Sequence, residues 1–206
     1  MAKYVTILLL TVMAGPVLFG QQDSLTDQKV YSSLIKSEIL STTKSVTILT
    51  RPEWDSSSLW WIRDPIKSKD PQRLAEIIFF IRDADGNGVK TIDSATLNHI
   101  LLFCEMKERD TVLRAFPDIP GVKVFPTPVF PIKTASEEEW KRFYKKHPGS
   151  GGIFRLSTIY YSPDGKEAVF YHARSLRGLN SHGALTVLEN VNGRWKIKYH
   201  IQIWQS

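Results

Sequence analysis

The chain has 206 residues, 42% of them hydrophobic, and carries a formal net charge of +6. That length is enough for one domain with a core of its own. Cys104 is the single cysteine, which excludes an intramolecular disulfide and leaves core burial as the source of stability. Because Cys104 follows an apolar run, we expect a buried side chain there rather than a catalytic thiol.

The N-terminus is typical of a secretory signal peptide. Lys3 supplies a positive charge, and residues 5–19 are almost wholly apolar. This run is shorter than the roughly 20 residues that a membrane-spanning helix needs, which favours cleavage near Gly20 over a retained anchor. We therefore expect residues 1–20 to be a signal peptide and the mature chain to be exported, periplasmic or secreted, with no membrane span.

Residues 21–94 are predicted to form the helical part of the domain. Val30 and Leu34 fall on one side of a helix, and the Asp70–Pro71 pair is typical of a helix start. The predicted elements are a helix over 26–40, a strand over 45–50, a loop over 51–70 and a helix over 70–84.

The middle of the chain carries weaker signals. Residues 95–103 are apolar and fit either a strand or a short helix, whereas the prolines between residues 116 and 134 predict an irregular, extended crossing. Ser136 and Glu139 form a capping-box pattern, which predicts a helix that stops at His147.

The end of the chain has the alternation of a sheet with one buried and one solvated face. Trp195, Ile197 and Tyr199 alternate with Lys196 and Lys198. Turn sequences separate four predicted strands, over 153–161, 167–173, 184–189 and 194–204. We therefore expect a single α+β domain over residues 21–206, with N-terminal helices packed on one face of a C-terminal four-stranded antiparallel meander.

A pattern in the second half of the chain resembles a family of small exported bacterial proteins. Its members share a W-x-x-F-Y-x-x-x-P-x-S-x-G-x-x-x-L-S segment and a C-terminal hairpin that ends in a G-x-W strand. The resemblance covers about residues 95–206. The matching residues are Trp140, Phe143, Tyr144, Pro148, Ser150, Gly152, Leu156, Ser157, Ala168, Tyr171, Leu188, Glu189, Gly193, Arg194 and Trp195. The family has no established biochemical activity, so the resemblance implies fold and export but no function.

Relatives in that family often carry a C-G-G-L-C-G-like loop between the second and third strands of the sheet. This chain reads Leu176-Arg177-Gly178-Leu179-Asn180-Ser181 there, so Gly178 and Leu179 are kept while both cysteines are missing. Any role of those thiols in the relatives is lost or changed in this chain.

Positive charge is concentrated in the last third of the chain. Residues 21–140 carry 15 Lys or Arg against 18 Asp or Glu, whereas residues 141–206 carry 11 against 3. A basic surface can face lipid headgroups, a polysaccharide or nucleic acid, although scattered lysines also suit a merely solvated sheet face. Export argues against nucleic acid, and so does the way Lys and Arg occur singly, unlike in a platform that binds single strands.

The loop over residues 174–183 is the predicted contact surface, because Arg174, Arg177 and His182 gather there. We expect these residues and the basic sheet face to bind an anionic envelope component or a protein partner without catalysis. The alternative is an extracytoplasmic hydrolase that uses a histidine near this loop, His172 or His182, as acid or base. No spacing matches a known metal or nucleophile motif.

Two further segments are candidates for binding. Part of a calcium loop is matched by Asp83, Asp85 and Asn87 with their glycines. The twelfth position of such a loop is normally an acidic residue, but here it is Ser94. The same residues are ordinary turn formers, so the sequence favours a turn without a cofactor and leaves calcium as the alternative. Trp60 and Trp61 are expected to fill the core rather than to contact a sugar or a partner.

Overall fold

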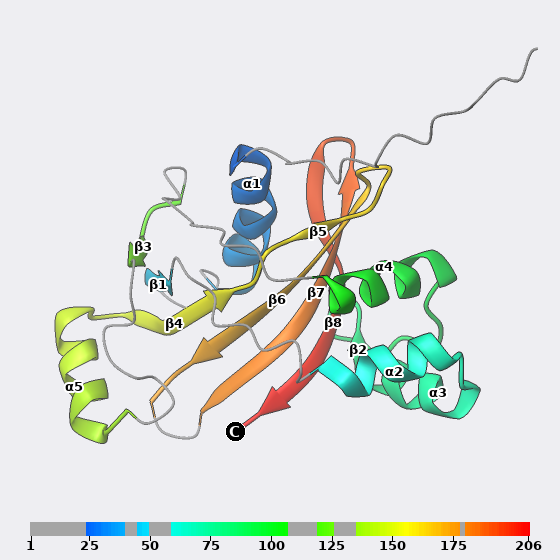
Figure 1. Ribbon diagram of the computed structural model, residues 1–206. Coiled ribbons are helices and arrows are strands. Elements are labelled where there is room, and N and C mark those ends of the chain that lie inside the picture. Colours follow the sequence, from blue (N-terminus) through cyan, green and yellow to red (C-terminus); the bar gives the residue numbers. More distant parts are fainter. Residues whose placement is uncertain (1–23, 40–44, 50–58, 107–118, 126–134, 178–179) are drawn as a thin grey trace, which may run out of the picture.

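The computed structural model describes residues 24–39, 45–49, 59–106, 119–125, 135–177 and 180–206. The predicted signal peptide and the greater part of the proline-rich crossing lie outside these residues. A long, strongly twisted sheet runs through the molecule, with helices grouped near its two ends and one helix at its middle (Figure 1). None of the described helices is long and apolar enough to cross a membrane.

The helices and strands follow one another along the chain in a mixed order. The helical elements are α1 (Ser24–Leu34), continued by a π-helical turn (Ile35–Ile39), α2 (Trp60–Ser68), α3 (Pro71–Phe80), α4 (Ser94–Glu105) and α5 (Glu137–Lys146). The strands are β1 (Ser45–Leu49), β2 (Ile81–Arg82), β3 (Val122–Phe125), β4 (Ser150–Leu156), β5 (Tyr160–Tyr161), β6 (Glu167–Ser175), β7 (Ser181–Val191) and β8 (Arg194–Gln205).

The sheet is mixed, with the order β2-β8-β7-β6-β4-β1-β3 and with β5 paired to β6. Strands β4, β6, β7 and β8 pair antiparallel in sequence order. However, β1 runs parallel to both β4 and β3, and β2 adds a further antiparallel edge. The α+β prediction is confirmed. The sheet is mixed and has eight strands, so the prediction of a four-stranded antiparallel meander is wrong.

Helices cover both faces of the sheet, so the prediction of helices on one face is wrong. Tyr31 of α1 packs edge-on against Phe170 of β6, with ring centroids 5.2 Å apart. The neighbouring residues Val169 and Tyr171 point to the opposite face, where α2, α3 and α4 pack. We call the first side the α1 face and the second the α4 face. At the far end of the α4 face, Trp140 and Phe143 of α5 cover β1 and β4.

A β-bulge in β8 explains why Ile197 and Tyr199 lie on opposite faces of the sheet. Val187 of β7 pairs with Tyr199, but the next residue, Leu188, pairs with Ile197, which leaves Lys198 as an extra residue. The alternation of β8 therefore changes sides at Lys198. Ile197 packs on the α1 face and Tyr199 on the α4 face, although the sequence pattern places both on one side.

The helix predictions hold in part. Asp70 caps α3 and Ser136 with Glu139 forms the capping box of α5, as predicted. Residues 60–68 were predicted as loop but form α2, which keeps Pro65 in its interior. Ile62, Pro65 and Ile66 are buried one helical turn apart, and this burial outweighs the cost of the proline. The ambiguous segment 95–103 lies within a helix, α4.

Candidate functional site

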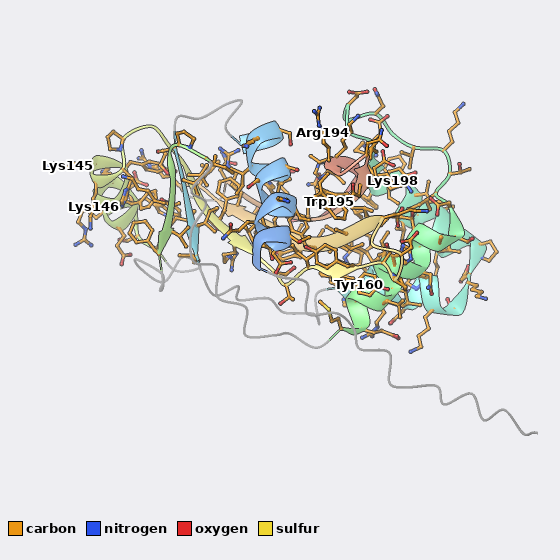
Figure 2. All side chains as sticks on the ribbon, turned by 90° about the horizontal axis from the view of Figure 1, so that it is seen from above. Lys145, Lys146, Tyr160, Arg194, Trp195 and Lys198 are labelled. Carbon is orange, nitrogen blue, oxygen red and sulfur yellow. The ribbon has the colours of Figure 1, made fainter. Side chains whose placement is uncertain are left out.

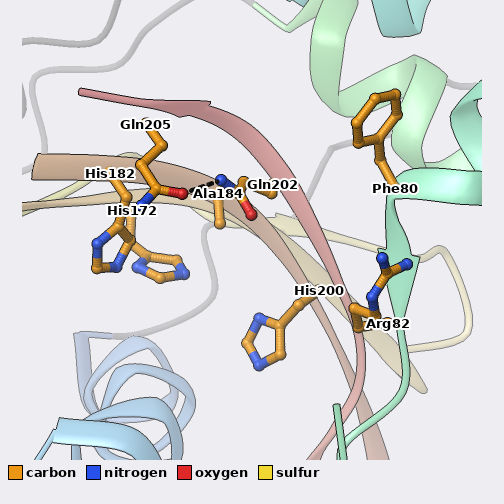
Figure 3. Close-up of a pocket in the computed structure, with 8 residues that line it drawn as sticks. All are labelled: Phe80, Arg82, His172, His182, Ala184, His200, Gln202 and Gln205. Atoms are coloured by element: carbon orange, nitrogen blue, oxygen red, sulfur yellow. Dashed lines mark hydrogen bonds between the residues drawn. The ribbon is translucent and has the colours of Figure 1, made fainter. Parts of the chain in front are cut away.

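A pocket of about 360 Å³ opens on the α1 face, where β6, β7 and β8 run side by side (Figure 3). This volume lies at the small end of the range for ligand pockets and corresponds to roughly a dozen waters. We call it the histidine pocket. Its lining residues are Phe80, Arg82, His172, His182, Ala184, His200, Gln202 and Gln205.

The strand register brings these residues together. Residues directly opposite each other on antiparallel strands share a face, so each row across the sheet places its side chains side by side. Three successive rows build the pocket. They are Arg82–His200–Thr186, then Gln202–Ala184–His172, then Gln205–His182–Arg174. The ring centroids of His172 and His200 lie 6.2 Å apart.

Ala184 makes room for the pocket. It lies between His172 and Gln202 in the middle row, and its methyl group leaves space that a larger side chain would fill. Figure 3 shows the imidazoles of His172 and His182 close to each other and that of His200 further along β8. The side chain amide of Gln202 donates to Gln205 Oε1 at 2.9 Å, which fixes the two amides relative to each other.

Hydrogen-bond donors predominate around the pocket. The guanidinium of Arg82 donates from Nη1 to the carbonyls of Phe79 and Ile81, at 2.6 and 3.0 Å, and a guanidinium has further N–H groups beyond these. Each imidazole supplies at least one N–H, and each glutamine an amide N–H. The described lining residues include no carboxylate. The site is therefore suited to a ligand that accepts hydrogen bonds and carries negative charge.

Thr186 holds the ring of His200. Its Oγ1 lies 3.0 Å from His200 Nδ1, within hydrogen-bonding distance. Thr186 is fully buried, so its hydroxyl is placed to orient the imidazole and not to attack a substrate. Thr186 is therefore not placed to act as a nucleophile itself, because a nucleophile has to reach the substrate.

Of the predicted contact residues, only His182 lines the pocket. Arg174 lies in the same row, but its Nε donates to the carbonyl of Gly151 at 2.8 Å and its guanidinium stacks on Phe154. Arg177 forms an ion pair with Glu137 of α5 instead of pointing towards the pocket rows. The structure thus brings Arg174 and His182 together and separates them from Arg177, and it adds His172 and His200, both identified in the sequence as polar candidates.

A second polar cluster, on the α4 face, had no signal in the sequence. Lys198 donates to Glu167 Oε1 at 2.6 Å and to Asp93 Oδ2 at 3.0 Å, and His99 Nδ1 lies 2.6 Å from Glu167 Oε2. Thr96 donates to Glu167 as well, at 2.8 Å. These contacts join α4 to β6 and β8 across about a hundred residues of sequence, a distance that no local pattern reveals.

The charges of this cluster hold one another in the ionised form. Burial alone raises the pKa of the Asp93 carboxyl, but the N–H of Thr96 and the ammonium of Lys198 lower it to about 2. Burial also raises the pKa of Glu167, and hydrogen bonds from Lys198, His99 and Thr96 outweigh it, so the net shift is downward. Burial lowers the pKa of Lys198, whereas Glu167 and Asp93 raise it above its ordinary value.

The candidate calcium residues form a tight turn. Asp83 Oδ1 accepts hydrogen bonds from the backbone N–H groups of Asp85 and Asn87, at 3.0 and 2.8 Å. These bonds lower the pKa of Asp83. Among the residues that the structure describes, no group of three or more His, Cys, Asp or Glu is arranged to hold a metal. Calcium binding by Asp83, Asp85 and Asn87 stays a prediction, and thermal melts in calcium and in chelator would test it.

The basic residues of the last third of the chain are spread over the molecule. Figure 2 shows Lys145 and Lys146 on α5 at one end, and Arg194 and Lys198 beyond α1 towards the other. Lys198 is ion-paired with acidic residues. The high local charge of the sequence is therefore divided among separate places rather than gathered in one patch.

Cys104 is buried, as predicted, and burial raises its pKa to about 12. A thiol with that pKa is not a nucleophile near neutral pH.

Comparison of the chain with models of protein families, with curated proteins and with solved structures finds no match in any of the three. The resemblance to small exported bacterial proteins therefore stays a prediction.

Proposed function

We propose that this chain is an exported, non-enzymatic binding domain of the cell envelope that takes an anionic ligand in the histidine pocket. The observation that carries the proposal is the lining of that pocket. Three imidazoles, a guanidinium and two amides surround it, and the described lining residues contribute no carboxylate. An anion placed there would replace its water contacts with N–H donors on fixed strands.

Binding fits the site better than hydrolysis. The only hydroxyl in the three pocket rows is that of Thr186, which is fully buried beside His200. The histidines can therefore hold an anion, but the rows provide no exposed side-chain nucleophile for them to activate, so hydrolysis there would need an activated water. The expected ligand is an oxyanion, either a carboxylate or a phosphate.

The test is calorimetric titration of the protein with acetate and with inorganic phosphate at constant ionic strength. We expect one anion to bind at one site, and Ala184→Leu to weaken that binding at least tenfold, because the leucine side chain occupies the pocket. The matched control is Lys196→Gln, which removes an exposed charge from the α4 side of β8 and should leave binding unchanged.

Two results would contradict the proposal. Either neither anion binds, or Ala184→Leu binds as tightly as the unmodified protein while its melting temperature shows that it is folded. Turnover of ester or phosphoester substrates that is lost in both His172→Ala and His182→Ala would instead favour the hydrolase.

A further inference from the structure

Exposed aromatic side chains border the histidine pocket. Phe79 and Phe80 at the end of α3 are 69% and 46% exposed, unusual values for residues of this size. Their rings pack edge-to-face with centroids 5.5 Å apart, and Phe80 packs in the same way against Trp61 of α2, at 5.7 Å. We call Trp61, Phe79 and Phe80 the aromatic cluster.

The aromatic cluster and the pocket are continuous. Phe80 belongs to both, since it lines the pocket and contacts the other two rings. Arg82 connects them a second time, because it lines the pocket and its guanidinium lies over the ring of Phe79, 5.9 Å from the centroid. In Figure 3, Phe80 and Arg82 lie to the right of β8, and the three histidines lie to its left.

We propose that the ligand of the pocket is an amphipathic anion, with its charged group among the histidines and its alkyl chain over the aromatic cluster. This inference rests on the proposed function and adds the ligand class to it. The pocket provides donors for the anionic group, and the cluster provides apolar surface that gains free energy when a hydrocarbon chain covers it. Neither part alone accounts for large aromatic rings exposed beside a pocket lined by hydrogen-bond donors.

Two alternatives explain less of the site. A small inorganic anion would fill the pocket but leave Phe79 and Phe80 exposed. A neutral hydrocarbon would cover the rings but leave the donors of Arg82 and the imidazoles facing an apolar group, which costs free energy. An alkyl carboxylate or alkyl phosphate satisfies both regions.

The experiment compares butanoate, hexanoate and octanoate by calorimetric titration, each below its micelle-forming concentration, with octanamide as the uncharged control. Burying a methylene group on the rings should strengthen binding about twofold to fourfold. Octanoate is therefore expected to bind at least tenfold more tightly than butanoate, and octanamide at least tenfold more weakly than octanoate.

The variant Phe79→Ser should bring the ratio of the octanoate and butanoate dissociation constants towards one. Trp60→Ser is the matched control, because Trp60 belongs neither to the pocket lining nor to the aromatic cluster. It lies on the first turn of α2 and is 53% exposed, so the prediction that it fills the core is wrong. This substitution should leave the ratio unchanged.

The outcomes separate this inference from the proposed function. Equal binding of butanoate and octanoate would overturn the amphipathic ligand while anion binding stands. Octanamide that binds as tightly as octanoate, or an equal loss in Trp60→Ser, would also overturn it, because adsorption to exposed rings would then explain the data. If none of the carboxylates binds, and acetate and phosphate fail as well, the proposed function itself is wrong.

Discussion

Lys198 joins the two halves of the chain through charge. Its ammonium lies between Glu167 of β6 and Asp93 at the start of α4, and its side chain is only 23% exposed. The bulge in β8 gives Lys198 this position, because the extra residue turns it towards α4. Removing a half-buried cation leaves its two carboxylate partners without a counter-charge, which costs more stability than breaking a surface ion pair.

We predict that Lys198→Met lowers the free energy of unfolding by about 2 kcal/mol, because two carboxylates lose a charged hydrogen-bond donor. Lys196→Met is the matched control, two residues away and exposed, and should change stability by less than about 0.5 kcal/mol. Denaturant unfolding at neutral pH measures both. Equal effects of the two substitutions would contradict the structural role of Lys198.

The same cluster predicts how stability depends on pH. The pKa values of Asp93, about 2, and of Glu167 are lower in the folded chain than in the unfolded one. The contribution of the two carboxylates to the free energy of unfolding is therefore complete above the ordinary carboxyl pKa of about 4. It is lost as the pH falls through their pKa values in the folded chain. The pKa of Lys198 is raised, so its contribution is present at neutral pH and is lost above its ordinary range.

Unfolding curves measured from pH 7 down to pH 2 should show that the free energy of unfolding falls at low pH in the unmodified protein. The fall should be shallower in Lys198→Met. A pH dependence that is identical in the two proteins would show that the cluster is not its source.

At the scale of elements, local signals predicted the starts of helices and the turns. Asp70 and Ser136 cap α3 and α5 because capping depends on neighbouring residues alone. The Asn192–Gly193 turn between β7 and β8 has both residues at positive φ, as such a hairpin requires. Pairing between distant strands left no such signal, so the parallel contacts of β1 with β3 and β4 could not be predicted.

The candidate site shows the same limit. The sequence identified His172, His182 and His200 as polar candidates, but it placed the contact surface on the loop with Arg177. Only the register of β6, β7 and β8 shows that these histidines share one pocket with Arg82, about ninety residues earlier in the chain. Residues brought together by strand pairing at long range are invisible to periodicity and spacing.

Gly183 sets how closely β7 and β8 pack on the α4 face. A Cβ at this position would collide with the Trp204 indole and the Tyr171 hydroxyl, which are joined by a hydrogen bond of 2.8 Å. We predict that Gly183→Ala lowers the free energy of unfolding by about 1–3 kcal/mol through overpacking. Gly88→Ala, where the nearest atom lies at an ordinary 3.8 Å, is the matched control and should be neutral or slightly stabilising.

Thermal unfolding followed by tryptophan fluorescence measures this difference and reports on Trp204 at the same time. If Gly183→Ala is as stable as Gly88→Ala, the close contact between the two strands is not important for the fold.

For the whole molecule, the prediction is export. When the full chain is expressed in a bacterial host, N-terminal sequencing should find a mature protein that begins at or near Gln21, outside the cytoplasm. Leu9→Arg, which places a charge in the apolar run, should keep the protein uncut and inside the cell. A chain that keeps Met1 and remains in the membrane fraction would show that residues 1–20 are an anchor.

The histidine pocket opens on the α1 face of the sheet, over β6, β7 and β8. The five histidines of the chain provide a direct test, because three line the pocket and two do not. His99 is held by Glu167 on the α4 face. His147 is buried against Phe143 at the end of α5, and burial, Lys123 and Lys146 lower its pKa.

The most direct measurement is the nuclear magnetic resonance spectrum of the histidine rings during titration with octanoate, at constant pH and ionic strength. The ring signals of His172, His182 and His200 should shift together and saturate at one common concentration, while those of His99 and His147 stay in place. Equal shifts of all five signals, or no saturable shift in the three pocket histidines, would contradict binding in the histidine pocket.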